Sequence, residues 1–353
     1  MNYGWKKSIC ATGAAAIGGI LLAGCNGETS GEAGGGEGGT HELTISHFLP
    51  SHHLVHDEIL ADFTAELEEQ TDGRITSEIY SAGALGEPGS QYDMAVTGTA
   101  DLAISVHGFT PGRFPLVSIV ELPFLTESAE NGSQIIQKLY EEFDEFQDEH
   151  EDTTPLWLFT AEPAQFISAE HRIETPEDLN GLRVRSPSPL ATDIIEALGG
   201  TPVSMPMGEV YESLQRGVVD AAMVPFSAVY DYNFYDVIDY ITVGHFSMTP
   251  FFSTMNTTTY ESLSDSDQEL IDSISGGEMA AKSGEVFDRT GDIAIDSSEE
   301  AGITFIHLDE EGMAPWEEAL DPIVEQWIAS MEEQGYPGRE IYERALELGE
   351  ELN

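Results

Sequence analysis

Short apolar runs alternate with amphipathic stretches along the chain after residue 40. Residues 43–46 and 75–80 predict strands, and between them residues 57–70 place apolar side chains at helical spacing. A helix over about residues 89–96, a strand over residues 101–106 and a strand that begins at Leu156 continue the alternation. Strands and helices in this order are typical of an α/β fold.

Two longer helices are predicted in the last third of the chain. Residues 266–269 read Ser-Asp-Gln-Glu, which is a capping-box pattern, and predict the start of a helix that continues towards Arg289. Near the C-terminus one apolar stripe at helical spacing is expected in the core rather than at an interface. Its members are Trp316, Leu320, Ile323, Val324, Trp327, Ile328 and Met331.

The chain is too long for a single hydrophobic core, so two α/β lobes are expected, joined by long connecting helices. We expect lobe I to contain residues 41–162 and 249–288, and lobe II to contain residues 163–248 and 289–353. Ligands of open α/β sheets bind at the carboxyl ends of the strands. Two facing lobes would therefore bring the loops near Pro50, His107, Arg185 and Pro225 around one cleft.

The first 40 residues predict export. Lys6 and Lys7 precede an apolar run that is too short and too rich in glycine for a spanning helix. Residues 22–25, Leu-Ala-Gly-Cys, resemble a lipobox, which predicts a lipoprotein signal peptide over residues 1–25 and lipidation of Cys25. A plain cleaved signal is the alternative. Residues 26–40 predict a flexible tether rich in Gly and Glu, and the protein is expected at the outer face of the cytoplasmic membrane.

The charge balance points to a salty environment. The chain has 13 Lys and Arg against 65 Asp and Glu, a formal net charge of -52. Self-repulsion of this size is tolerable where molar salt shortens the Debye length to about 3 Å. Hydrophobic residues make up 41% of the chain, enough for a core, so an acidic disordered chain is excluded. Nucleic acid is a poor partner for such a charge. The composition therefore predicts a halophilic protein.

Arg185 is the leading candidate for a functional side chain. It ends what reads as a strand, in a chain that keeps few cations. A guanidinium binds a carboxylate through two parallel hydrogen bonds and stays charged at any ordinary pH. Arg183 lies two residues earlier and is the better candidate for a structural ion pair. The pattern predicts that Arg185 holds the carboxylate of a ligand.

The segments around Arg185 resemble the solute-binding subunit of tripartite ATP-independent periplasmic (TRAP) transporters, the DctP family. No single segment is a specific motif, but their order matches the family. They are residues 179–187, 199–203, 209–220 and Pro225, preceded by residues 71–75, 85–86, 98–102 and 121–125. The resemblance implies a two-lobed fold like type II periplasmic binding proteins. It also implies a receptor that delivers an organic acid to a membrane permease, without a cofactor.

The resemblance further implies which positions line the pocket beside Arg185. They are Val224, Met207, Phe48 with the loop to His53, Glu87, and His107 with Val106. Sugar-acid binders of the family carry Asn and an aromatic residue at the first two of these positions, so a less polar monocarboxylate or a keto acid is expected. Many members also have an arginine where residues 161–165 stand. A second carboxylate would here need Gln165, His107 or a backbone amide.

Two other classes of function are weighed against this interpretation. His47, His52, His53 and His56 crowd one loop, and His52 and His56 could share a helical face as zinc ligands do, which would indicate a surface receptor for zinc or manganese. An enzyme is disfavoured because the chain has no nucleophile elbow, no His-Glu-x-x-His helix and no phosphate loop.

Overall fold

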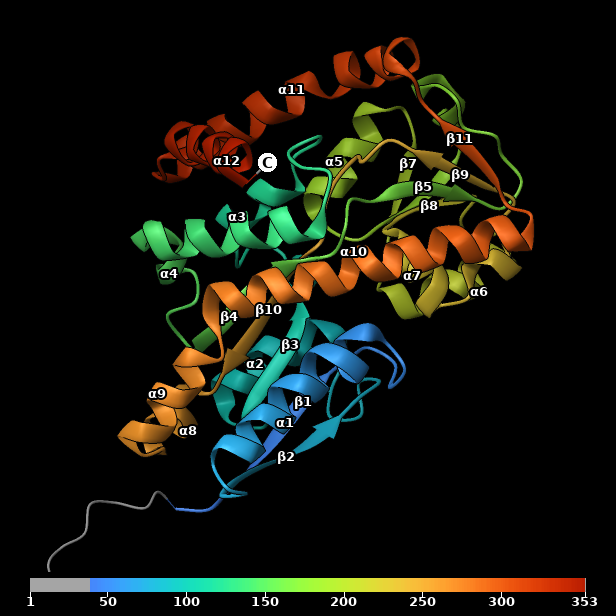
Figure 1. The fold of residues 1–353 in the computed structure, drawn as a ribbon. Coiled ribbons are helices and arrows are strands. Elements are labelled where there is room, and N and C mark those ends of the chain that lie inside the picture. Colours follow the sequence, from blue (N-terminus) through green and yellow to red (C-terminus); the bar gives the residue numbers. More distant parts are fainter. Residues whose placement is uncertain (1–38, 353) are drawn as a thin grey trace, which may run out of the picture. The chain divides into compact units, whose positions relative to one another are not determined.

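A computed structural model describes residues 39–352 (Figure 1). Residues 37–353 form one compact unit. The predicted signal peptide, Cys25 and nearly all of the predicted tether lie outside the described residues. Among the described helices, none is long and apolar enough to cross a membrane.

The strands form two mixed sheets. The first has the order β2-β1-β3-β10-β4, in which β1 pairs in parallel with β2 and β3, and β10 is antiparallel to both neighbours. The second has the order β11-β9-β5-β8-β6-β7, in which β5 is antiparallel to both neighbours. The strands are β1 (His41–His47), β2 (Ile75–Tyr80), β3 (Leu102–Val106), β4 (Thr154–Thr160), β5 (Gln165–Ser168), β6 (Arg183–Ser186), β7 (Thr201–Ser204), β8 (Ala221–Val224), β9 (Tyr240–Val243), β10 (Pro250–Met255) and β11 (Thr304–His307).

Helices cover both sheets and fill the connections between strands. Seven are short or medium in length and follow strands or loops: α1 (Ala61–Gln70), α2 (Gln91–Thr97), α4 (Asp144–Asp148), α5 (Pro189–Ala197), α6 (Val210–Gln215), α7 (Phe226–Asp231) and α8 (Thr257–Ser262). The others are α3 (Ala129–Glu142), α9 (Asp265–Ser273), α10 (Gly276–Ala301), α11 (Glu310–Gln334) and α12 (Gly338–Leu352). A π-helical turn, Val55–Leu60, leads into α1.

The alternation read from the sequence is confirmed at most elements, because β1, β2, β3, β4, α1 and α2 lie where strands and helices were expected. The predicted helix from Ser266 towards Arg289 is wrong. Ser264 caps α9 by accepting a hydrogen bond from the Asp267 N–H, and α9 ends at Ser273. The chain then turns at Gly276, the first residue of α10. Its φ of 63° lies in the left-handed region that glycine tolerates.

The long helix α10 runs beside both sheets (Figure 1) and contacts α3, α7 and β4. Its buried residues recur at helical spacing, so one face packs along its whole length. Gly284 lies where α10 approaches α3 closely, because a Cβ there would stand 2.4 Å from the Ala129 carbonyl oxygen. The helix therefore packs against both sheet regions and connects them.

The strands of the first sheet all come from residues expected in lobe I, and those of the second from residues expected in lobe II. The boundaries themselves stay a prediction. One hydrophobic cluster contains side chains next to both sheets, and α12 contacts α3. The predicted C-terminal stripe belongs to this cluster, in which Val324 is partly buried and the other members are fully buried, so its assignment to the core is confirmed.

Candidate functional site

Arg185 lies at the carboxyl end of β6, between the parallel strands β7 and β8. Its side chain is 1% exposed. The Nε–H donates to the Met205 carbonyl at 3.1 Å, and Nη1 donates to the Met223 carbonyl at 3.0 Å. Burial lowers the pKa of the guanidinium to about 10, so it is charged at neutral pH. The backbone thus fixes a buried cation in one orientation.

Arg185 differs from most cations of residues 39–352 because it forms no ion pair. Every lysine and arginine there except Lys138 and Arg185 forms an ion pair with a carboxylate. Arg183 is 45% exposed and binds Asp220 through Nε at 3.0 Å and Nη2 at 2.7 Å. The prediction that Arg183 makes the structural ion pair is confirmed. A buried guanidinium without a carboxylate carries a desolvation cost that an anionic ligand would offset.

A small, mainly apolar cavity contains the Arg185 side chain. The space open to the centre of a water molecule is about 30 Å³, little more than one or two waters require. Aromatic rings dominate its walls, and few groups in it are polar. Its lining residues include Phe48, His53, Val106, Phe109, Arg185, Met207, Ser227, Tyr232, Thr249, Phe251 and Phe287.

The structure brings Arg185, Met207 and Phe48 of the predicted residues together in this cavity. Val224 is buried in the apolar cluster beneath, and its neighbour Pro225 lines the cavity instead. Glu87 is an exposed residue at the start of a short turn, Pro88–Ser90. Neither residue borders the Arg185 cavity as the structure stands.

Gln165 and His107 also lie elsewhere. The Gln165 amide nitrogen donates to the Pro163 carbonyl, and its oxygen accepts from Gly244 N–H, so this side chain ties together the segments that cross between the sheets. His107 follows Val106 directly, and Val106 lines the Arg185 cavity. The His107 ring instead contacts His150, with 3.1 Å between their Nε2 atoms.

Several cavity residues were not singled out from the sequence, among them Phe251, Phe287 and Tyr232. The pairing register offers a signal for the first, because Phe251 lies opposite Val106 in the β10–β3 ladder. Phe287 lies on α10 and Tyr232 directly follows α7, and the sequence gives no indication of which side chains there meet the cavity.

The histidine cluster makes hydrogen bonds instead of gathering around one point. His47 Nε2 lies 2.9 Å from His56 Nδ1, and His52 Nε2 lies 3.0 Å from the Asp231 carbonyl oxygen. Burial lowers the pKa of His47 to about 4 and that of His53 to about 3, so both are neutral at pH 7. No group of three or more His, Cys, Asp or Glu side chains within residues 39–352 could hold a metal ion. The predicted alternative of a metal receptor has no support.

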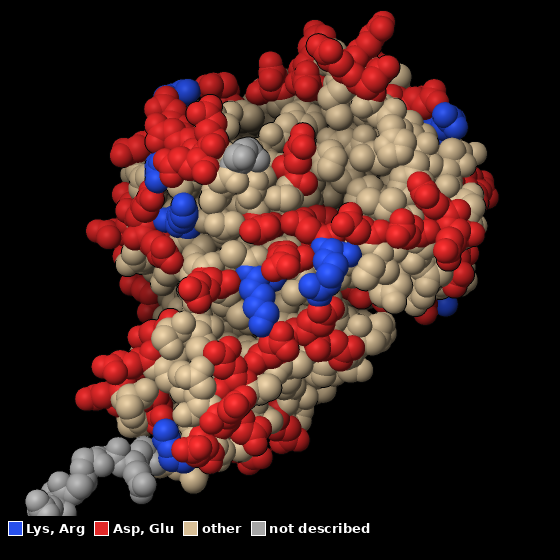
Figure 2. Space-filling view, viewed as in Figure 1, with Lys and Arg blue, Asp and Glu red and all other residues tan. Residues whose placement is uncertain are grey.

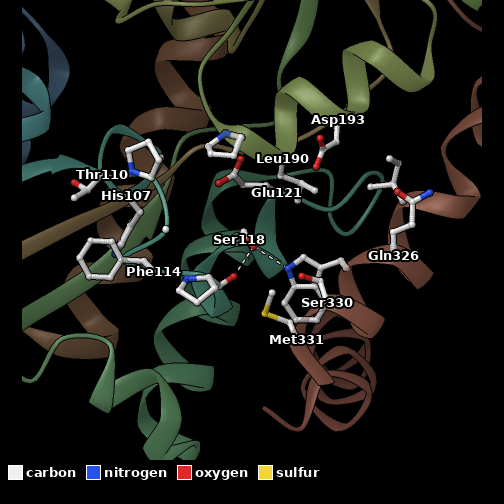
Figure 3. Close-up of a pocket in the computed structure, with 17 residues that line it drawn as sticks. His107, Thr110, Phe114, Ser118, Glu121, Leu190, Asp193, Gln326, Ser330 and Met331 are labelled. Atoms are coloured by element: carbon white, nitrogen blue, oxygen red, sulfur yellow. Dashed lines mark hydrogen bonds between the residues drawn. The ribbon is translucent and has the colours of Figure 1, made fainter. Parts of the chain in front are cut away.

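A second and larger cavity offers about 420 Å³ by the same measure. It lies between the segment 107–121, α5 and α11, and Figure 3 shows the Glu121 and Asp193 carboxyl groups facing it. Burial raises the pKa of Glu121 to about 7, although a hydrogen bond from Ser188 opposes this. No lysine or arginine lines this cavity, so nothing in its walls would attract an organic anion.

Comparison with known proteins decides the family. The model of the bacterial extracellular solute-binding protein family 7, DctP, matches residues 45–330. The chain belongs to this family. The predicted resemblance to TRAP solute-binding proteins is therefore confirmed. The family is one of binding proteins, which agrees with the expectation that the chain is not an enzyme.

Solved structures of TRAP solute-binding proteins share the fold. One from a marine metagenome, specific for aromatic acid ligands and crystallised with 3-hydroxybenzoate, is 30% identical, with a TM-score of 0.85 over 89% of this chain and 99% of that one. One from Rhodoferax ferrireducens with benzoate is 25% identical, with a TM-score of 0.85 over 88% of this chain and 98% of that one. A third, from Bordetella bronchiseptica with bound mandelate, is 25% identical, with a TM-score of 0.84 over 88% and 99%. The expected two-lobed α/β fold is confirmed.

Proposed function

We propose that this chain is the extracytoplasmic receptor of a TRAP transporter, and that Arg185 holds the carboxylate of its organic acid. The observation that carries the proposal is the Arg185 guanidinium, which is buried at a cavity and forms no ion pair within residues 39–352. A ligand carboxylate would supply the missing counter-charge through a charge-assisted hydrogen bond. The receptor would then deliver the acid to the membrane permease of the transporter.

The walls of the cavity favour an aromatic monocarboxylate. Phe48, Phe109, Phe251 and Phe287 offer rings against which an aryl group can pack edge-on or offset. Arg185 is the one cation of the lining and His53 is neutral, so a single negative charge balances the site. The metagenome and Rhodoferax relatives hold 3-hydroxybenzoate and benzoate, which supports this ligand class. Because the cavity is small as it stands, we expect it to widen when an acid of this size enters.

The proposal also includes where the protein is located and the salt concentration in which it works. Residues 22–25 support a lipid anchor at Cys25, followed by the tether of residues 26–40, at the outer face of the membrane. The formal charge of -52 supports work in concentrated salt.

Calorimetry of the full chain in molar salt with benzoate and 3-hydroxybenzoate tests the ligand proposal. We expect Arg185→Met to weaken binding by about thirtyfold or more, because loss of a buried charge pair costs about 2–5 kcal/mol. Arg183→Met is the matched control. It removes a guanidinium two residues away on the same strand, and we expect it to leave affinity within about twofold.

The ligand-free melting temperature separates binding from folding. Arg185→Met removes a buried charge that has no protein counter-ion, so we expect it to melt within a few degrees of the original protein. Unchanged benzoate affinity in Arg185→Met would refute the proposed role. Zinc and manganese belong in the same panel. A rise in melting temperature with these metals alone would favour the alternative of a zinc or manganese receptor.

A further inference from the structure

Tyr232 lines the same cavity as Arg185 and is held in a fixed position. It directly follows α7, and its ring stacks on Phe234 with centroids 5.8 Å apart. Asn233 between them has a φ of 54°, a left-handed conformation that asparagine tolerates, and this turns the chain back on itself. The His53 ring lies edge-on to Tyr232 at 6.1 Å. These contacts leave the ring little freedom before a ligand arrives.

The Tyr232 hydroxyl makes no hydrogen bond within the part of the chain that the structure describes, residues 39–352. Burial raises the pKa of the phenol, and Asp231 adds to the rise while Arg185 opposes it. The group therefore keeps its proton at neutral pH and can donate it. The effect is mutual, because Tyr232 opposes the fall in the pKa of Arg185 that burial causes. The hydroxyl and the guanidinium thus act on the same small space.

Arg185 alone cannot donate all the hydrogen bonds that a bound carboxylate can accept. A guanidinium has five N–H groups, and the Met205 and Met223 carbonyls occupy the Nε–H and one on Nη1. The parallel pair of bonds that would include Nε–H is therefore not available, and three N–H groups on Nη1 and Nη2 remain for a ligand. A carboxylate can accept about four hydrogen bonds, so it has room for another donor.

Other polar groups of the cavity are mostly committed. Ser227 donates both its N–H and its hydroxyl to Glu162. His53 Nδ1 accepts from Val55 N–H, which places the ring proton on Nε2, and Nε2 lies 3.4 Å from an Asp231 carboxyl oxygen. Besides Tyr232, Thr249 is the other lining residue with a hydroxyl that could donate.

We propose that Tyr232 donates its hydroxyl hydrogen to the carboxylate of the bound aromatic acid and so completes, with Arg185, a clamp of two side chains. This inference rests on the proposed function. Arg185 can only donate hydrogen bonds and carries a positive charge, so the site should select a negatively charged head group. A carboxamide of the same shape is neutral and should bind far more weakly.

Tyr232→Phe tests the clamp, because it removes the hydroxyl and keeps the ring with its stacking on Phe234. We expect its affinity for benzoate, measured by calorimetry on the full chain in molar salt, to fall about ten- to a hundredfold, as for loss of a hydrogen bond to a charged group. Tyr230→Phe is the matched control, because Tyr230 lies two residues earlier, on α7, is 43% exposed and is outside the cavity lining. Thr249→Val tests the competing hydroxyl.

The melting temperature of the ligand-free protein distinguishes a binding role from a structural one. The hydroxyl has no protein partner, so Tyr232→Phe should melt with the original protein while its benzoate-induced shift shrinks. Benzoate affinity within twofold of the original in Tyr232→Phe, with Arg185→Met still defective, overturns the clamp and leaves the proposed function standing. Absence of benzoate and 3-hydroxybenzoate binding in the original protein overturns both.

Discussion

Burial favours the neutral form of several carboxyl groups. It raises the pKa of Asp231 to about 7 and those of Glu149 and Glu162 to about 8. Glu162 accepts hydrogen bonds from both the N–H and the hydroxyl of Ser227, which lines the Arg185 cavity. With Glu162 largely protonated at neutral pH, Arg185 remains the dominant charge at this cavity.

The raised pKa values predict how stability depends on pH. Between pH 4.5 and 6.5 the folded carboxyl groups bind more protons than the unfolded ones, but His47 and His53 bind fewer, so the two effects oppose each other. Above about pH 6.5 the histidine contribution fades, because unfolded histidine also loses its proton there, and the carboxyl groups dominate. Stability is then lost as the pH rises through their folded pKa values. We expect the melting temperature in molar salt to fall over this range.

Glu162→Gln isolates one contribution to this pH dependence. Glutamine can still accept from the Ser227 N–H, but it cannot titrate. One fully linked proton changes stability by about 1.4 kcal/mol per pH unit, so the variant should show a shallower decline above pH 6.5 in thermal unfolding. An identical slope in the two proteins would mean that Glu162 is ionised in the folded state throughout.

At the scale of elements, the contact between α10 and α3 holds the two sheet regions together. Asp288 on α10 accepts hydrogen bonds from the backbone N–H groups of Ala129 at 2.7 Å and Glu130 at 2.9 Å, at the start of α3. A carboxylate there satisfies two of the free N–H groups of the helix end and suits its dipole. Gly284, one turn earlier on α10, allows the backbones to approach.

Gly284→Ala should therefore destabilise the protein, although alanine is the better helix former. The added Cβ would lie 2.4–2.5 Å from backbone atoms of Ala129 and Glu130, which cannot move aside as a flexible side chain would. We expect a loss of about 1–3 kcal/mol in urea unfolding, as for other overpacked sites. Gly277→Ala is the control on the same helix. Nothing lies within 4 Å of its added Cβ, so it should gain up to about 1 kcal/mol. Equal gains in both variants would contradict the close packing.

At the scale of the molecule, acidic side chains are spread over the visible surface. Figure 2 shows them scattered across the face with uncharged surface between them and with few lysines and arginines among them. The cations that do occur mostly sit beside carboxylates, as Lys282 does with Asp62 at 2.9 Å and Arg344 with Glu142 at 2.7 Å. Such exposed pairs contribute little each and do not neutralise the excess. Long-range attraction of an anionic ligand is excluded, so capture depends on contacts inside the cavity.

Salt should consequently control folding. At low ionic strength the repulsion among 65 acidic side chains is unscreened, and we expect the circular dichroism spectrum to lose its folded form below about 0.1 M salt. Sodium and potassium chloride should restore it at similar ionic strength if screening is the cause. A spectrum unaltered by dilution would contradict the halophilic interpretation.

The sequence by itself determined the alternation of strands and helices and the family, and it proposed Arg185 over Arg183 as the ligand-binding cation, because periodicity and composition are local properties of the chain. The two arginines are two residues apart and so project from the same face of β6, but Arg183 begins the strand and pairs with Asp220 at the surface, whereas Arg185 lies further along and is buried. Tertiary structure alone decided which side chains line the Arg185 cavity. Tyr232, Phe251 and Phe287 reach the cavity from distant segments, while His107 and Gln165 take hydrogen bonds elsewhere. The reason is that side-chain direction at a strand end or on a helix depends on packing between elements, which no local pattern encodes.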